Sequence, residues 1–314
     1  MKIAVIMVVA AMTVVLLAAA PVPQGQGAGA DTQRKPTLFL IGDSTVRNGA
    51  DNGSNGQWGW GHILPYYFDK TKINVENLAV GGTSSRTFMQ NPRMWPAILP
   101  KVQAGDFVMM QFGHNDNTAR PEADTTRWRS TLPGNGEDVV QGLVQGGGTE
   151  TVHSFGWYMR KFISETKGKG ATPIVCSLIP RNRWTGDKVN RNAKDYSLWA
   201  KEAAEQEHVA FIPLNTMISD QYDTLGKEKV AGLFPPNEAV HPNWAGARLN
   251  AEMVVEGVKK LDLPLKMYVA MHPKAPEEAD IKPPAHGELG PEGEAVLTRR
   301  RGGGAATAPA TRAQ

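Results

Sequence analysis

Five short apolar segments, separated by longer amphipathic ones, constrain the fold of this chain more than any other feature. The apolar segments lie at residues 37–41, 74–80, 106–112, 173–179 and 209–214. Their nearly continuous apolar character is typical of strands in a parallel sheet that is covered on both faces. Helical periodicity is present at residues 155–170, 193–208 and 244–261. This alternation predicts a three-layer α/β/α domain with right-handed crossovers.

The two ends of the chain differ in composition from the part between them. Lys2 precedes an uncharged apolar run at residues 3–20, and small residues follow at 28–30, which is typical of an export signal peptide. The run is long for a signal peptide, so an uncleaved N-terminal anchor is the alternative. From residue 273 the chain is rich in Pro, Gly, Ala and Glu, as disordered tails are. We expect a signal peptide at 1–30, a folded domain at 31–272, a disordered tail at 273–314, and a secreted or periplasmic protein.

The composition indicates an ordinary globular protein and excludes several functional classes. Hydrophobic residues make up 41% of the 314 residues, which is enough for a sizeable core. The formal net charge is only +3 and the one basic run, at 298–301, lies in the predicted tail, so nucleic acid is not an expected partner. Cys176 is the only cysteine, which excludes an intramolecular disulfide. Its apolar neighbours predict a buried, unreactive thiol.

Polar residues and glycines follow the first three predicted strands where each strand ends. Ser44 follows the first strand in GDSTV, Gly81 and Gly82 follow the second in AVGGTSSRTF, and Asn115 follows the third in QFGHNDN. Ligands of open parallel sheets bind beyond the carboxyl ends of the strands. A serine there can act as a nucleophile, while glycine N–H groups and an Asn amide can stabilise an oxyanion. Taken singly, each residue also fits a helix cap or a tight turn.

A candidate base and acid come late in the chain, in the sequence NEAVHPNWAG. His241 lies just before the last amphipathic segment, and Glu238 lies three residues earlier. By itself this stretch fits a surface loop better than a catalytic site. A nucleophilic serine, however, needs a base within reach, and the base needs a carboxylate to orient it. The long segment 113–152, rich in Gly, Asn and Thr, also indicates function, because structureless loops of that length are uncommon in compact domains.

These blocks, in this order, resemble those of the SGNH (GDSL-type) hydrolases, and within them the rhamnogalacturonan acetylesterase-like group. The matching stretches are GDSTV, QWGWG at 57–61, AVGGTSSRTF, QFGHNDN and SLIPRNRW at 177–184, and the resemblance covers nearly all of 37–270. It implies a flavodoxin-like fold with a central five-stranded parallel sheet, and no metal or cofactor. It also implies that Ser44 is the nucleophile, that His241 is the base, and that Ser44, Gly82 and Asn115 supply the oxyanion hole.

Two positions depart from the pattern of this family. The family usually has an Asp three residues before the histidine, where this chain has Glu238. Glutamate serves as the third triad member in other serine hydrolases. Thr83 stands where relatives often carry an arginine. We expect both departures to affect rate and specificity, and neither to affect the fold.

The resemblance predicts a monomeric exported esterase that removes O-acetyl groups from plant cell-wall polysaccharide, most specifically rhamnogalacturonan or pectin. Alternatives are an SGNH esterase acting on acetyl-xylan, lipid or small esters, and a non-catalytic glycan-binding relative. No membrane contact is expected beyond the N-terminal segment. Residues that could contact an acidic polysaccharide, and that fit core packing or structural ion pairs equally well, are Trp58, Trp60, Arg86, Arg181 and Trp184. No role is predicted for His114 or His153.

Overall fold

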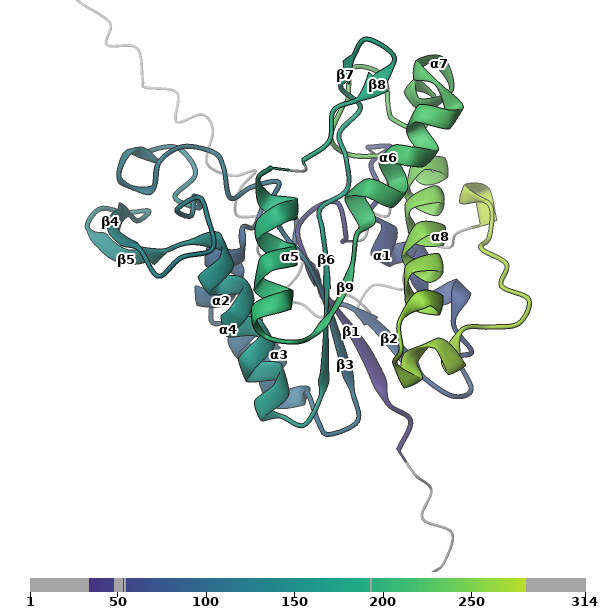
Figure 1. Cartoon of the computed structure of the whole chain (residues 1–314), viewed down its shortest axis with the longest axis horizontal. Helices are drawn as coiled ribbons and strands as arrows, with labels where there is room; N and C mark the ends of the chain where they lie inside the picture. The colour runs from purple at the N-terminus through teal and green to yellow at the C-terminus, as the bar shows by residue number, and fades with distance from the viewer. Residues whose placement is uncertain (1–33, 48–52, 54, 193, 281–314) are drawn as a thin grey trace, which may run out of the picture. The chain divides into compact units, whose positions relative to one another are not determined.

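Five parallel strands form the centre of the domain in the computed structural model (Figure 1). They are β1 (Thr37–Gly42), β2 (Asn74–Asn77), β3 (Phe107–Gln111), β6 (Thr172–Cys176) and β9 (Ala210–Ile212), in the spatial order β2-β1-β3-β6-β9. The structure describes residues 34–47, 53, 55–192 and 194–280, so the predicted signal peptide lies outside the described residues. The predicted α/β fold is confirmed, and each of the five apolar segments overlaps one strand.

The strand order reverses between β1 and β3, and this reversal positions the site. From β1 the chain proceeds outward to β2, and it then returns to β3 on the other side of β1. In open parallel sheets the loops diverge at such a switch point and leave a crevice beyond the carboxyl ends of the strands. The segments that follow β1, β2 and β3 therefore meet at the upper edge of the sheet in Figure 1.

Helices cover both faces of the sheet because alternate strand side chains point to opposite sides. Leu38 and Leu40 of β1 pack in one core, whereas Phe39 and Ile41 pack in the other. The first core includes residues of α1 (Trp60–Ile63), α6 (Leu214–Leu225), α7 (Lys227–Ala231) and α8 (Trp244–Lys260). The second includes residues of α2 (Ser85–Gln90), α3 (Trp95–Ile98), α4 (Phe155–Gly168) and α5 (Tyr196–Gln206). Figure 1 shows the two sets of helices on either side of the sheet.

The three predicted helices correspond to α4, α5 and α8, and the structure adds α6, which has 12 residues, and several shorter elements. Helices α1, α2, α3 and α7 have four to six residues each. Helices this short are unstable alone and depend on tertiary packing, so periodicity does not predict them. Short 3₁₀ helices lie at Leu64–Tyr67, Leu99–Lys101, Pro121–Ala123, Pro264–Tyr268 and Glu278–Asp280. Every helix in the described part of the chain is too short or too polar to cross a lipid bilayer.

The segment predicted to be a structureless loop, 113–152, instead contains most of an antiparallel hairpin. Strands β4 (Val139–Leu143) and β5 (Thr149–His153) pair with Val139 opposite His153. Residues Gly146, Gly147 and Gly148 turn the chain between them, each with a positive φ that favours glycine. A second, smaller hairpin joins β7 (Trp184–Thr185) and β8 (Lys188–Val189). Both hairpins lie outside the central sheet (Figure 1).

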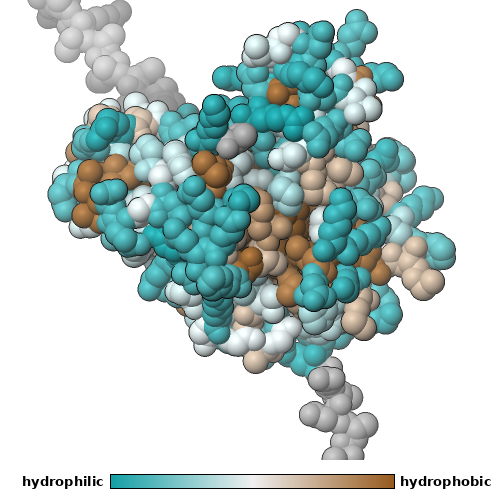
Figure 2. Space-filling model, in the orientation of Figure 1, coloured by the Kyte–Doolittle hydropathy of each residue, from teal (hydrophilic) through white to brown (hydrophobic). Residues whose placement is uncertain are grey.

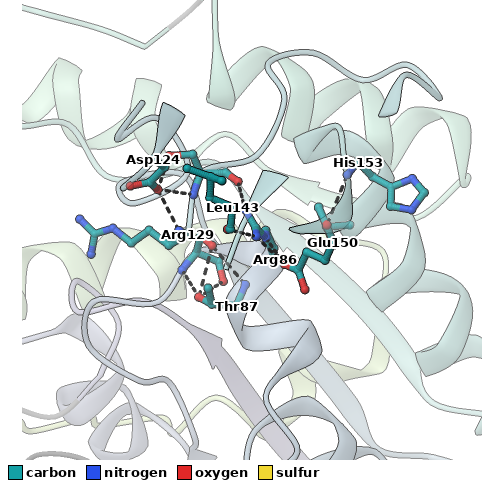
Figure 3. Close-up of polar contacts among 10 residues, drawn as sticks. Arg86, Thr87, Asp124, Arg129, Leu143, Glu150 and His153 are labelled. Atoms are coloured by element: carbon teal, nitrogen blue, oxygen red, sulfur yellow. Dashed lines mark hydrogen bonds and ion pairs between the residues drawn. The ribbon is translucent and has the colours of Figure 1, made fainter. Parts of the chain in front are cut away.

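Arg86 of α2 fastens the β4–β5 hairpin to the domain (Figure 3). Its guanidinium is buried and forms an ion pair of 2.5 Å with Glu150 of β5. It also donates to the carbonyl oxygens of Ser130 at 3.0 Å and Leu143 at 2.9 Å. A buried guanidinium needs partners for both its charge and its N–H groups, and the hairpin supplies them. These contacts give Arg86 a structural role in place of the predicted contact with substrate.

Ordered contacts extend eight residues into the segment predicted to be a disordered tail. The indole N–H of Trp58 donates to Glu278 at 2.8 Å, and that of Trp244 donates to the Pro276 carbonyl at 3.2 Å. Arg248 of α8 pairs with Glu277 at 3.2 Å. The rest of the predicted tail, 281–314, lies outside the described residues.

Candidate active site

Ser44 lies directly after β1, on a turn that a network of buried side chains holds in place. Asp43 accepts hydrogen bonds from the backbone N–H of Thr45 at 2.9 Å and from its hydroxyl at 2.8 Å. Gln111, at the end of β3, donates to the Thr45 hydroxyl at 2.7 Å and accepts from the indole N–H of Trp60 at 2.9 Å. These buried hydrogen bonds hold the turn from several sides, while Oδ2 of Asp43 is buried and has no partner among the described residues.

Ser44, His241 and Glu238 form a continuous hydrogen-bonded relay. The Oγ atom of Ser44 lies 2.8 Å from Nε2 of His241, and Nδ1 of His241 lies 3.1 Å from Oε2 of Glu238. With the proton on Nδ1, the ring donates to Glu238 and accepts from the serine hydroxyl. Ser44 and His241 are 197 positions apart in the sequence, so only the fold brings them together. This is the donor–acceptor order that general-base activation of a serine requires.

The carboxylate of Glu238 is held from two sides. Its Oε1 atom accepts from the backbone N–H groups of Ala239, Val240 and His241 at 2.8, 2.7 and 3.3 Å. Its Oε2 atom accepts from the Gln57 amide at 2.8 Å in addition to the His241 ring. Burial acts to raise the pKa of Glu238, but the hydrogen bonds from Val240 and His241 outweigh it and lower the pKa. The carboxylate thus stays ionised beside the ring.

The longer side chain of Glu238, relative to the aspartate usual in the family, is accommodated by folding back over its own loop. Asn237 adopts a positive φ of 61°, a conformation that Asn tolerates better than most residues. The Glu238 N–H then bonds to the Pro235 carbonyl at 3.1 Å and closes a turn. The Pro242 carbonyl accepts from the Trp58 N–H at 2.8 Å, which ties this loop to the QWGWG segment. The carboxylate therefore reaches both the ring and the loop amides.

Gly82 and Asn115 lie side by side at the ends of β2 and β3. The Asn115 amide donates one hydrogen to the Thr83 carbonyl at 2.9 Å, which leaves its second hydrogen available. Gly82 has a φ of 76°, a conformation that strongly favours glycine. Among the described residues, the backbone N–H groups of Ser44 and Gly82 donate to no protein acceptor. Each of these groups thus has an N–H hydrogen that no described residue accepts, and their role as an oxyanion hole stays a prediction.

Two of the predicted sugar-stacking aromatic residues belong to the protein interior. Trp60 is fully buried and its indole N–H bonds to Gln111, while Trp58 is 2% exposed and packs edge-on against Trp244. A ring that stacks on a sugar must present a face to solvent, and neither does. The structure therefore places Trp58 and Trp60, like Arg86, in packing positions. Core packing thus replaces the predicted substrate contact for the two tryptophans, and buried polar contacts replace it for Arg86.

Arg181 and Trp184, in contrast, are partly exposed. Arg181 donates to the His114 carbonyl at 3.4 Å, and Trp184 donates to the Asn182 side chain at 2.8 Å. The backbone N–H of Asn182 bonds to the Ala239 carbonyl at 2.8 Å. The segment 181–184 thus lies directly beside the loop that carries Glu238 and His241.

His114 and His153 differ in their surroundings. His114 is buried, and burial lowers its pKa to about 4 although the nearby carboxylate of Asp43 acts in the opposite direction. The ring is therefore neutral at pH 7. His153, in β5, stacks on Trp157 with 3.7 Å between ring centroids and belongs to the hairpin. In the described part of the chain, no group of three or more His, Cys, Asp or Glu residues is arranged to hold a metal ion.

Three polar residues of this region were not identified from the sequence. Gln57 supports Glu238, Arg129 donates to the Gly82 carbonyl at 2.9 Å, and Arg183 lies beside Arg181 at the edge of a pocket. Gln57 lies in QWGWG, one of the stretches that carry the family resemblance, so the sequence could have indicated it as a site residue. Nothing in the local pattern distinguishes Arg129 or Arg183 from other surface arginines.

Asp116, next to Asn115, is a buried carboxyl group whose protonation is linked to stability. Its Oδ1 atom accepts from the Ser85 N–H and hydroxyl at 3.1 and 2.5 Å, while Oδ2 has no partner among the described residues. Burial raises the pKa of Asp116 to about 7, and the bonds from Ser85 counteract this only in part. The folded protein therefore retains this proton at pH values where the unfolded chain has lost it.

We expect Asp116→Asn to remove part of the pH dependence of stability. In the wild type, Asp116 makes the free energy of unfolding fall as the pH rises from about 4 to 7, by up to about 4 kcal/mol, because only the unfolded chain releases the proton in that range. Asn resembles the protonated acid and does not titrate. Urea unfolding of both proteins at pH 5 and pH 8 measures the difference. Equal pH dependence in the two proteins would contradict the raised pKa.

The fold and the relay together define the class of protein. A parallel sheet with this strand order and a serine–histidine–carboxylate relay at its switch point is the arrangement of an SGNH hydrolase. Residues 40–249 match the model of the GDSL-like Lipase/Acylhydrolase family. The chain belongs to this family, and the predicted family is confirmed.

Several known proteins are similar to this chain over most of its length. It is 30% identical over 228 residues to the "Uncharacterized esterase YxiM" of Bacillus subtilis, covering 71% of this chain and 52% of that protein. It is 28% identical over 222 residues to the "Rhamnogalacturonan acetylesterase" of Emericella nidulans, covering 71% of this chain and 84% of that protein. The crystal structure of YxiM superposes with a TM-score of 0.58 at 29% identity, covering 72% and 57% of the two chains. The chain thus spans about half the length of YxiM.

Proposed function

We propose that this protein is an exported esterase that removes O-acetyl groups from plant cell-wall polysaccharide, most specifically from rhamnogalacturonan. The observation that carries the proposal is the relay from Ser44 through His241 to Glu238, with free hydrogen-bond donors beside it. The names of two relatives support the assignment of rhamnogalacturonan as the substrate. The Emericella protein is named a rhamnogalacturonan acetylesterase, and a Bacillus subtilis protein that is 30% identical over 233 residues is named a probable one.

The proposed reaction has two acyl-transfer steps. In the first, Ser44 Oγ attacks the acetyl carbonyl carbon while Nε2 of His241 takes the hydroxyl proton. The N–H groups of Ser44 and Gly82 and the amide of Asn115 stabilise the oxyanion of the tetrahedral intermediate. His241 then returns the proton to the departing sugar oxygen, and the acetyl group remains on Ser44. In the second step, water attacks this acyl-enzyme with the same base, and acetate and free Ser44 are released.

Glu238 has an electrostatic role in this reaction. It remains ionised, holds the Nδ1–H tautomer of His241, and stabilises the imidazolium that forms when the serine proton is taken. Gln57 and the loop amides keep the carboxylate in place without competing for the ring nitrogen. Export is part of the proposal because plant polysaccharide lies outside the cell, and the apolar N-terminal segment supplies the signal.

Acetate release from defined polymers tests the substrate. We expect faster release from acetylated rhamnogalacturonan than from acetylated xylan at equal acetyl concentration, measured with an enzyme-coupled acetate assay. Release from xylan alone, or only from aryl and lipid esters, would overturn the assignment to rhamnogalacturonan. No hydrolysis of any acetyl ester, with specific binding to the polysaccharide, would favour a glycan-binding protein instead.

A further inference from the structure

A pocket beside the relay contains two arginines that form no ion pair with any residue the structure describes. The pocket measures about 150 Å³ and is lined in part by Gly113, Asn117, Arg181, Arg183, Asn190 and Tyr196. Arg191 also reaches the pocket, but it is paired with Asp220 at 2.8 Å and Asp223 at 2.7 Å. Among the described residues, neither Arg181 nor Arg183 forms an ion pair. The net positive charge of the pocket therefore comes mainly from these two side chains.

The position of this pocket links it to the reacting atoms. Arg181 bonds to the carbonyl of His114, the residue that precedes Asn115, and Asn182 bonds to the loop that carries His241. An acetylated sugar with its acetyl group at Ser44 would therefore place a neighbouring part of the polymer at the two arginines. On the face shown in Figure 2, the surface around β7 and β8, which follow Arg183 in the chain, is mostly hydrophilic.

The electrostatics favour an anion in the pocket. Burial and then the charge of the neighbouring Arg183 lower the pKa of Arg181, so the charged form of Arg181 is less stable here than in water. The carboxylates of Asp43, Asp195 and Glu238 act in the opposite direction, but none of them lies in the pocket lining or pairs with either arginine. A carboxylate placed between the two guanidinium groups would compensate their repulsion and accept charge-assisted hydrogen bonds. The asparagine amides supply further donors and acceptors for sugar hydroxyls.

We propose that Arg181 and Arg183 form a subsite for the carboxylate of a uronic acid unit in the polymer, close to the acetyl group that Ser44 attacks. This inference rests on the proposed function and deepens it, because it assigns two named residues to recognise the galacturonate carboxylates of the proposed polymer. Neutral acetylated polymers such as unsubstituted acetyl-xylan lack that group. The subsite thus accounts for selectivity among polysaccharides that all present the same acetyl ester to Ser44.

Binding of short unacetylated oligosaccharides tests the subsite without any turnover. Calorimetric titration of the full chain with trigalacturonate and with xylotriose should show tighter binding of the acidic sugar, which weakens as NaCl rises from 50 to 500 mM. Arg181→Gln and Arg183→Gln should each weaken trigalacturonate binding by about tenfold, which corresponds to one lost charge-assisted bond. Arg93→Gln, at an exposed arginine outside the pocket, is the matched control and should bind as the wild type does. Circular dichroism verifies that each variant is folded.

Equal affinity for trigalacturonate and xylotriose, or wild-type affinity in both pocket variants, would overturn the subsite. Failure of the subsite can be distinguished from failure of the proposed esterase activity. Ser44-dependent acetate release without arginine-dependent binding would leave the esterase intact and remove the subsite. Arginine-dependent binding without acetate release would support the subsite and remove the proposed esterase activity.

A separate set of contacts points to a role for Arg129 behind the proposed oxyanion hole. Its Nη1 atom donates to the Gly82 carbonyl at 2.9 Å, and its Nε atom donates to the Thr118 hydroxyl at 3.0 Å. That hydroxyl in turn donates to the Asn115 carbonyl at 3.1 Å. Arg129 is thus bonded, directly or through one hydroxyl, to both segments that hold the donors beside Ser44.

The backbone around Arg129 is itself fixed. Asp124 accepts from the N–H groups of Arg127 at 3.0 Å, Arg129 at 2.9 Å and Ser130 at 3.0 Å. Figure 3 shows Asp124 and Arg129 in this cluster, close to Arg86. Burial acts to raise the pKa of Asp124, but the bonds from Arg129 and Ser130 outweigh it and lower the pKa well below its usual range. We infer that Arg129 is a positioning residue. It keeps the backbone N–H of Gly82 and the side-chain amide of Asn115 in place as oxyanion donors.

Kinetics with 4-nitrophenyl acetate tests this positioning role. Arg129→Met should lower kcat by about 10- to 100-fold while changing KM little, because a displaced donor affects the transition state most. Arg129→Lys should restore part of the loss, and Arg127→Met, at an exposed arginine of the same loop, should match the wild type. Rates are normalised to active sites titrated with an organophosphate. Wild-type kcat per active site in Arg129→Met would contradict the positioning role.

Discussion

Replacing Ser44 by alanine is expected to lower kcat for 4-nitrophenyl acetate and for acetylated rhamnogalacturonan by about 10⁴-fold or more. Without the hydroxyl no acyl-enzyme can form, and only the weak effect of the oxyanion donors on direct attack by water remains. The side chain of Ser44 bonds only to His241 among the described residues, so the variant should fold as the wild type does. Initial rates and thermal unfolding of the two proteins measure both expectations.

Ser164→Ala is the matched control for this substitution. Ser164 lies exposed on α4, and among the described residues its hydroxyl bonds only to the Lys161 carbonyl, so its loss should leave the rates unchanged. Equal rates in Ser44→Ala and the wild type would show that the serine mechanism is wrong.

Replacing Glu238 is expected to have the second-largest effect. Glu238→Gln should lower kcat by about 10²- to 10⁴-fold, because a neutral amide neither holds the Nδ1–H tautomer nor stabilises the imidazolium. Glu238→Ala should also lose stability, since the amides of Ala239 and Val240 lose their acceptor. Glu238→Asp should retain most of the activity, because aspartate keeps the negative charge and is the residue that the family usually has at this position. Steady-state kinetics with 4-nitrophenyl acetate measures all three variants.

Gln57→Met tests the hydrogen bond that Gln57 donates to Glu238, while the Glu238 carboxylate itself stays in place. The substitution removes one of the bonds to Oε2 of Glu238 but leaves the contact with the His241 ring and the loop amides. We expect a loss of less than tenfold in kcat, in the range of one neutral hydrogen bond. Full activity in Glu238→Ala would show that some other acid orients His241, or that none does.

The sequence predicted the central part of the fold because that part depends on local patterns. Each buried strand is a short apolar run, and α4, α5 and α8 each show an apolar stripe long enough to recognise. The prediction of a bare loop for 113–152 was wrong, because the β4–β5 hairpin depends on a distant anchor. Its strands are partly exposed and only one residue of each is buried, and Arg86, 64 positions before Glu150, holds them. Nothing within the hairpin itself indicates that contact.

Ser44, Gly82, Asn115, His241 and Glu238 were found from the sequence because each lies at a strand end or just before a helix. Their spacing along the chain, and not their surroundings, identifies them. The substrate-contact candidates were chosen by residue type, and residue type does not determine exposure. Trp58, Trp60 and Arg86 proved to be buried, whereas Arg181 and Trp184 proved to be partly exposed.

The sequence by itself determined the family, the order of the strands along the chain, and the candidate nucleophile, base and oxyanion donors, because these are encoded in short, contiguous stretches. The tertiary structure alone decided which arginines are structural, which remain unpaired beside the site, and how Glu238 is held. Burial and pairing depend on residues tens to hundreds of positions away, such as Gln57 and Glu238, which are 181 positions apart. Those long-range contacts form only when the strands come together at the switch point of the sheet.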